Sequence, residues 1–169
     1  MTIEEAIKTA IEYEERVRDI YYENAKKFHD ATARKIFTVL GEEEQKHVDY
    51  LEDRLEEWQK TGSVTVEKLD TVVPDMKSID EHVARLQKRA TQQDFADEIE
   101  MFKKALELEV ETSNYYKRLV RELPAENQEL FEQFVAIEEG HEGIVQAEIN
   151  AAQGLGVWFD FMEFDLEAG

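Results

Sequence analysis

The sequence predicts an all-α fold: a four-helix bundle made of two duplicated antiparallel helical hairpins joined by a long crossover connection. Helix breakers are few, with two prolines and seven glycines in 169 residues, and runs of glutamate, lysine, alanine and leucine favour helix. Apolar residues recur at helical spacing in four separate segments. The second half of the chain also repeats the pattern of the first half.

The first hairpin is expected near the N-terminus. Thr2 and Glu5 form a capping-box sequence that starts a helix over roughly residues 3–28. After a break near Asp30, a second helix extends to about Lys60. The loop between them is short, so the two helices are predicted to be antiparallel neighbours.

A long connection is predicted over residues 61–90. The stretch TGSVTVEKLDTVVPDMKS contains Gly62, Pro74 and several β-branched residues, and it has no helical period. A short helix is expected after Ser78, where Glu81 would complete another capping box. A connection of this length can run along the bundle and let a second hairpin pack against the first.

The second hairpin follows this connection. Its first helix is expected over residues 94–122, and Pro124 opens a second helix that ends at Gly154 and Gly156. The two hairpins and their connection predict one bundle domain over residues 1–153.

The C-terminal tail, residues 154–169, has the sequence GLGVWFDFMEFDLEAG, in which aromatic residues alternate with acids. It is too short to cross a membrane. We expect its aromatic side chains, Trp158, Phe159, Phe161 and Phe164, to cover an apolar groove. The groove lies on the same bundle or on a second copy, and we favour the second copy, which predicts a homodimer.

The composition excludes several classes of partner. Forty acidic and twenty basic residues leave a formal net charge of −20, which repels nucleic acid and anionic membrane surfaces. The start, MTIEEAIK, lacks the basic and apolar regions of a signal peptide, so we expect a cytoplasmic protein. The chain has no cysteine, and its chemistry must therefore use oxygen and nitrogen groups.

Charged residues stand at core positions of all four predicted helices. Glu14 aligns with Glu109 when AIEYEERVRDIYY is placed on ALELEVETSNYY, and about thirty residues later each half has a Glu-x-x-His motif. Two residues three positions apart share one helix face. We therefore expect six side chains to converge in the core: Glu14, Glu44, His47, Glu109, Glu138 and His141.

Four buried carboxylates require a counter-charge. Without one, desolvation and mutual repulsion would raise their pKa values until they took up protons. Two divalent cations would cancel four negative charges. Carboxylates with two imidazoles suit iron or manganese and leave zinc possible. A glutamate from each of two helices and a Glu-x-x-His motif from each of the other two make up the ligand set of ferritin-like di-iron and di-manganese proteins.

Neighbouring polar residues are not expected to bind metal. Helix geometry turns four nearby glutamates toward solvent: Glu12, Glu43, Glu107 and Glu139. His29 and His82 are expected at the surface. Tyr21 and Tyr116 lie two turns from predicted ligands on the same faces. For these tyrosines, core packing is the simpler reading, and a hydrogen-bonding or redox role behind the ligands is the alternative.

Residues 3–153 resemble the rubrerythrin branch of the ferritin-like superfamily. The motifs that carry the resemblance are AIEYE, EQKH at 44–47, ALELE and EEGH at 138–141. The resemblance implies that Glu44 and Glu138 bridge two iron ions and that His47 and His141 each cap one. Glu14 and Glu109 would then be terminal or bridging ligands.

Two departures from rubrerythrin bear on function. The chain has no cysteine for the iron domain that supplies electrons in full-length rubrerythrin, so an external electron donor protein is expected. Thr112 stands where rubrerythrins commonly carry an extra glutamate, and the remaining six ligands are closer to the symmetric site of bacterioferritin-like proteins.

The resemblance implies a non-haem di-iron oxidoreductase that reduces hydrogen peroxide or dioxygen. One alternative is an iron-binding ferroxidase that acts in iron handling or storage. A second alternative is a metal-free structural or interaction module, in which the core carboxylates would have to be protonated.

Overall fold

The computed structural model describes residues 1–163, and helix is the only regular secondary structure in this part of the chain, which has no strand. The predicted all-α class is therefore confirmed. The elements, in chain order, are α1 (Ile3–Ala25), α2 (Ala31–Thr61), α3 (Met76–Leu86), the 3₁₀ turn Gln87–Arg89, α4 (Ala96–Glu122), α5 (Ala125–Leu155) and the 3₁₀ turn Phe161–Glu163.

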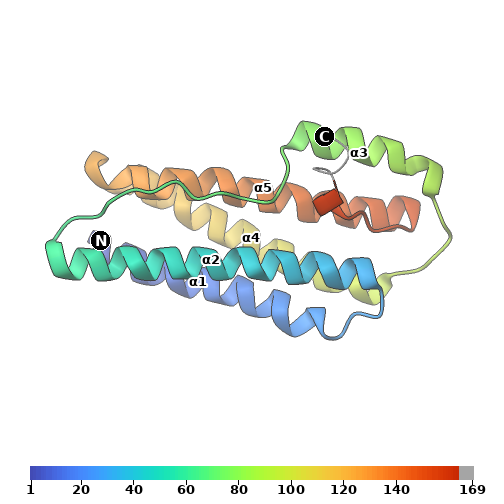
Figure 1. The fold of residues 1–169 in the computed structure, drawn as a ribbon, viewed down its shortest axis with the longest axis horizontal. Coiled ribbons are helices and arrows are strands. Elements are labelled where there is room, and N and C mark those ends of the chain that lie inside the picture. Colours follow the sequence, from blue (N-terminus) through green and yellow to red (C-terminus); the bar gives the residue numbers. More distant parts are fainter. Residues whose placement is uncertain (164–169) are drawn as a thin grey trace.

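The four long helices form a bundle of two helix pairs (Figure 1). Helix α1 packs along α2, helix α4 packs along α5, and α1 also contacts α4. Within each pair the chain reverses direction through a short loop, as Figure 1 shows. No helix within residues 1–163 has the length and apolarity that a membrane crossing needs.

Local sequence explains most helix ends. The Thr2 and Glu5 capping box is present at the start of α1, and the Asp30 side chain accepts a hydrogen bond from the Ala33 N–H at the start of α2. Helices α2 and α5 end at Gly62 and Gly156, which adopt the left-handed conformation with φ of 72° and 63°.

The predicted start of the short helix α3 was wrong by three residues. Its N-cap is Asp75, whose carboxylate accepts a hydrogen bond of 3.0 Å from the Ser78 N–H. Ser78 therefore lies inside the first turn of the helix. Both residues are good caps in isolation, and the extended backbone of Asp75 after Pro74 places its carboxylate at the free N–H groups.

Two apolar clusters fill the bundle, one toward each end. One contains Phe37, Phe102 and Ile144, and the other contains Ile7 and Phe131. On each long helix the predicted ligands lie between the residues of these two clusters. The six predicted ligands are therefore confined to a layer at mid-bundle.

The segment between α2 and α3 lies on the outside of the bundle and runs along it (Figure 1). Polar contacts hold it in place. The Tyr50 hydroxyl donates to the Glu67 carbonyl at 2.9 Å, and the Leu69 N–H donates to the Gln133 side chain at 3.0 Å. Helix α3 then packs against α5.

The tail packs on its own bundle as far as the structure describes it. The Trp158 ring stacks on Phe102 with 4.3 Å between ring centroids, and Phe159 and Phe161 are buried. Of the two predicted locations, these three aromatic residues occupy the groove of their own chain. Phe164 lies outside the described residues, and the homodimer stays a prediction.

Candidate metal centre

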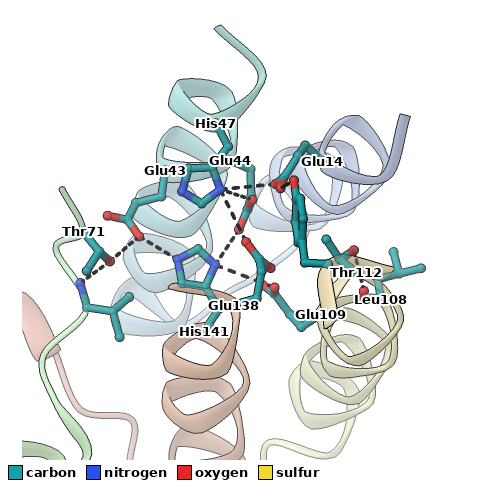
Figure 2. A network of polar contacts seen from close by, with 12 residues as sticks. Glu14, Glu43, Glu44, His47, Thr71, Leu108, Glu109, Thr112, Glu138 and His141 are labelled. Carbon is teal, nitrogen blue, oxygen red and sulfur yellow. Dashed lines mark hydrogen bonds and ion pairs between the residues drawn. The ribbon is translucent and has the colours of Figure 1, made fainter. Parts of the chain in front are cut away.

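All six predicted side chains meet at the middle of the bundle, and each is at most 1% exposed. Figure 2 shows them pointing toward one another from four helices. Glu14 comes from α1, Glu109 from α4, and the two Glu-x-x-His motifs from α2 and α5.

The ligand atoms fall into two overlapping groups, and within each group they all lie within 4.8 Å of one another. The groups are Glu14, Glu44, His47 and Glu138, and Glu44, Glu109, Glu138 and His141. Glu44 and Glu138 belong to both. The geometry therefore offers two adjacent positions for cations, each with its own histidine and glutamate and with two shared carboxylates.

Both imidazoles turn the same nitrogen toward the carboxylates (Figure 2). His47 Nδ1 lies 3.2 Å from Glu14 Oε2 and 3.1 Å from Glu44 Oε2. His141 Nδ1 lies 2.6 Å from Glu44 Oε1 and 3.6 Å from Glu109 Oε2. The two rings stack, with centroids 5.5 Å apart and planes 14° apart.

The pKa values of Glu44, Glu138 and both histidines are raised, which favours bound protons when no metal is present. Burial and the neighbouring carboxylates raise the pKa of Glu44 to about 7 and that of Glu138 well above its ordinary value. Burial alone would lower the pKa of His47, but Glu44 and Glu14 raise it to about 10. The pKa of His141 is raised by Glu44 and Glu109 against the effect of burial.

Several buried atoms of the cluster lack hydrogen-bond partners. Such atoms indicate whether divalent cations would suit the site. Within residues 1–163, three buried carboxylate oxygens of the cluster have no hydrogen-bond partner: Glu109 Oε2 and both oxygens of Glu138. Glu44 Oε1 and His141 Nδ1 lie 2.6 Å apart as an ion pair but make no hydrogen bond. A buried polar atom left unpaired costs about 1–3 kcal/mol. A divalent cation binds carboxylate oxygens and imidazole nitrogens together, so the residues fit two such ions.

Two tyrosines support the carboxylates that the groups do not share. The Tyr21 hydroxyl of α1 donates to Glu109 of α4, and the Tyr116 hydroxyl of α4 donates to Glu14 of α1. Burial and the nearby carboxylates raise the pKa of both phenols well above the ordinary value. Both hydroxyls therefore remain protonated donors.

The position of Glu43 differs from the one predicted from the sequence. It was predicted to face solvent, but only 2% of it is exposed. Its carboxylate accepts hydrogen bonds from Thr71 Oγ1 at 2.9 Å and the Val72 N–H at 2.5 Å, and it lies 2.6 Å from His141 Nε2. The segment before α3 covers this face of α2, and no signal in the local sequence of α2 indicates that cover.

The other polar neighbours lie outside the centre. Glu12, Glu107, Glu139 and His29 are exposed, as predicted, whereas His82 is partly buried in α3. Thr112 is buried. Its hydroxyl donates to the Leu108 carbonyl of its own helix at 2.8 Å.

Glycines in α5 lie beside the covering segment. A Cβ atom on Gly140 would lie 3.9 Å from Val73 Cγ1, and one on Gly143 would lie 2.3 Å from Met76 Sδ. The chain from Val73 to Met76 therefore passes close to α5 next to His141.

Comparison of the chain with protein-family models, with curated proteins and with solved structures found no match. The arguments for a function therefore come from the geometry and chemistry of the centre.

Proposed function

We propose that the protein is a non-haem di-iron oxidoreductase of rubrerythrin type, which reduces hydrogen peroxide or dioxygen with electrons from an external donor protein. The observation that carries the proposal is the pair of buried ligand groups that share Glu44 and Glu138. Iron is proposed over zinc because the set is rich in carboxylate oxygen, and manganese is the nearest competitor.

Each residue has a defined part in this proposal. Glu44 and Glu138 would contribute to both positions, His47 and Glu14 would complete one, and His141 and Glu109 would complete the other. When bound, two iron ions supply one electron each for reduction of the oxidant. Tyr21 and Tyr116 orient the two unshared carboxylates, and the surrounding apolar clusters exclude bulk water.

The same proposal includes a ferritin-like architecture with a history of duplication. The register of Glu14 on Glu109, and of one Glu-x-x-His motif on the other, supports two related hairpins. The packing of α1 on α2 and of α4 on α5 is compatible with them. The segment from α2 to α4 would then be the crossover that joins the hairpins.

A second candidate function is the oxidation of iron(II) in iron handling. The formal net charge of −20 favours it, because a strongly negative protein attracts cations. Thr112 also favours it, since the six remaining ligands form a symmetric set.

The test is metal analysis after anaerobic loading of the full chain with iron(II), followed by rapid mixing with peroxide or oxygen. We expect two irons per chain and fast oxidation by peroxide. Glu44→Ala and His141→Ala should each lose at least one iron, whereas the exposed control Glu139→Ala should keep both. Oxidation of many irons per chain would favour iron handling, and no binding would favour the metal-free alternative.

A further inference from the structure

We propose that Glu43 is a positioning residue for His141 and that it makes the two metal positions unequal. This inference rests on the proposed function, because it concerns how the same centre holds its metals. The sequence pattern alone treats the two halves of the centre as equivalent.

The two nitrogens of the His141 ring face two different environments (Figure 2). Nε2 lies 2.6 Å from Glu43 Oε2, and Nδ1 faces the carboxylates of Glu44 and Glu109. A neutral imidazole has one donor and one acceptor nitrogen. When a metal ion binds and the ring becomes neutral, the carboxylate at Nε2 would keep the remaining proton on Nε2, so that the lone pair of Nδ1 would point into the centre.

Glu43 is itself held in place. Its two oxygens accept hydrogen bonds from Thr71 Oγ1 and from the Val72 N–H. A main-chain donor and a hydroxyl from the segment before α3 therefore fix the carboxylate that orients His141. Ligand-type atoms of Glu43, His47 and His141 also lie within 4.8 Å of one another. We assign Glu43 a supporting role because its oxygens already have three donors.

His47 has no comparable support. Its Nε2 is buried and has no hydrogen-bond partner within residues 1–163. When the two Glu-x-x-His motifs are aligned, Ile137 stands where Glu43 stands in the first half. The two halves of the centre therefore differ in the group behind the histidine, although their ligands are the same.

This difference has a consequence for metal binding. A carboxylate behind a ligating histidine raises the basicity of the ligand nitrogen and fixes the ring, and loss of such a partner costs about 10–100-fold in metal affinity. We therefore expect the position next to His141 to bind metal more tightly than the position next to His47, so that it fills first.

The experiment is a calorimetric titration of manganese(II) into the metal-free full chain, with wild type and Glu43→Gln compared. The wild type should show two unequal binding steps. Glu43→Gln keeps the shape and removes the charge, so the tighter step should weaken about 10–100-fold, while the weaker step stays within about threefold. Glu42→Gln, an exposed neighbour, is the matched control and should change neither step.

A second readout reports the imidazole directly. In zinc-loaded protein, ¹H–¹⁵N correlation spectra should show a downfield, slowly exchanging Nε2–H proton on His141. This signal should move upfield in Glu43→Gln, which a purely structural role would not predict. If Glu43→Gln does not fold, Thr71→Val removes one donor to Glu43 and should weaken the same step by a smaller factor.

The outcomes separate the two proposals. A wild type that binds two metals with equal steps, or a Glu43→Gln variant with wild-type affinities and an unmoved Nε2–H signal, overturns the role of Glu43 and leaves the di-metal proposal intact. A wild type that binds no metal pair overturns the proposed function itself.

Discussion

Tyr116 of α4 donates its hydroxyl to Glu14 of α1, across the contact between the two helix pairs. Tyr21 of α1 makes the reciprocal bond to Glu109 of α4. Each unshared carboxylate of the centre is therefore held by a tyrosine from the opposite pair. These two bonds link the pairs at the level of the centre.

Replacement of Tyr116 by phenylalanine should destabilise the protein, because Glu14 Oε1 loses its buried donor. Hydrogen bonds to charged groups contribute about 1.5–3 kcal/mol, and we expect a loss of this size in the free energy of unfolding, measured with urea. Tyr13→Phe is the control, since Tyr13 stacks on Tyr115 away from the ligands. Equal losses in the two variants would argue against the importance of the bond.

The metal-free protein should lose stability as pH rises from about 5 to 10. The pKa of Glu44 rises on folding from 4.5 to about 7, and that of His47 from 6.5 to about 10. A raised pKa stabilises the folded state below the unfolded value, and this contribution is lost as pH rises through the folded value. The pKa of Glu43, lowered to about 2, acts in the opposite sense, but only below pH 4.5.

Urea unfolding at several pH values, with chelator present, measures this dependence. The loss should be on the order of a few kcal/mol, and the metal-loaded protein should not show it, because metal replaces the protons. A metal-free protein that is equally stable at pH 6 and pH 9 would contradict the prediction.

Metal loading at pH 7 should release protons. In the metal-free protein at pH 7, His47, with a pKa of about 10, holds a proton, and Glu44, with a pKa of about 7, holds about half of one. The raised pKa values of His141 and Glu138 favour further bound protons. Ligands must lose their protons to bind metal, so more than about one proton should leave as two divalent ions enter. Titration calorimetry in buffers of different ionisation enthalpy counts them, and release of fewer than about one proton would refute the described charge balance.

Two helical glycines should respond oppositely to alanine. A Cβ atom on Gly41 would lie 2.8 Å from the Tyr22 ring and 3.3 Å from Tyr21 Cβ, so Gly41→Ala should destabilise the protein by about 1–3 kcal/mol. Among residues 1–163 outside its own helix turn, a Cβ atom on Gly140 would have only Val73 Cγ1 within 4 Å, at 3.9 Å, so Gly140→Ala should stabilise the protein by about 0.5–1 kcal/mol through helix propensity. Thermal unfolding of both variants, side by side, checks the signs.

The sequence alone was sufficient to predict the four long helices and the six side chains that meet at mid-bundle. Helical periodicity is local, so a glutamate at a core position such as Glu14 stands out within its own helix. The Glu-x-x-His spacing likewise places Glu44 and His47 on one face, whatever the helix packs against. Helix ends were predicted less accurately, as Asp75 and Ser78 show, because several nearby residues can each act as the N-cap.

Only the tertiary structure determined which other side chains contact those ligands and hold them in place. Glu43 is buried because a segment almost thirty residues away covers it, and the tyrosines find carboxylates on the opposite helix pair. The Trp158 ring likewise stacks on Phe102 of its own bundle. Such contacts depend on how distant segments pack in three dimensions, and the periodicity of a single helix contains no information about the partner that covers its outer face.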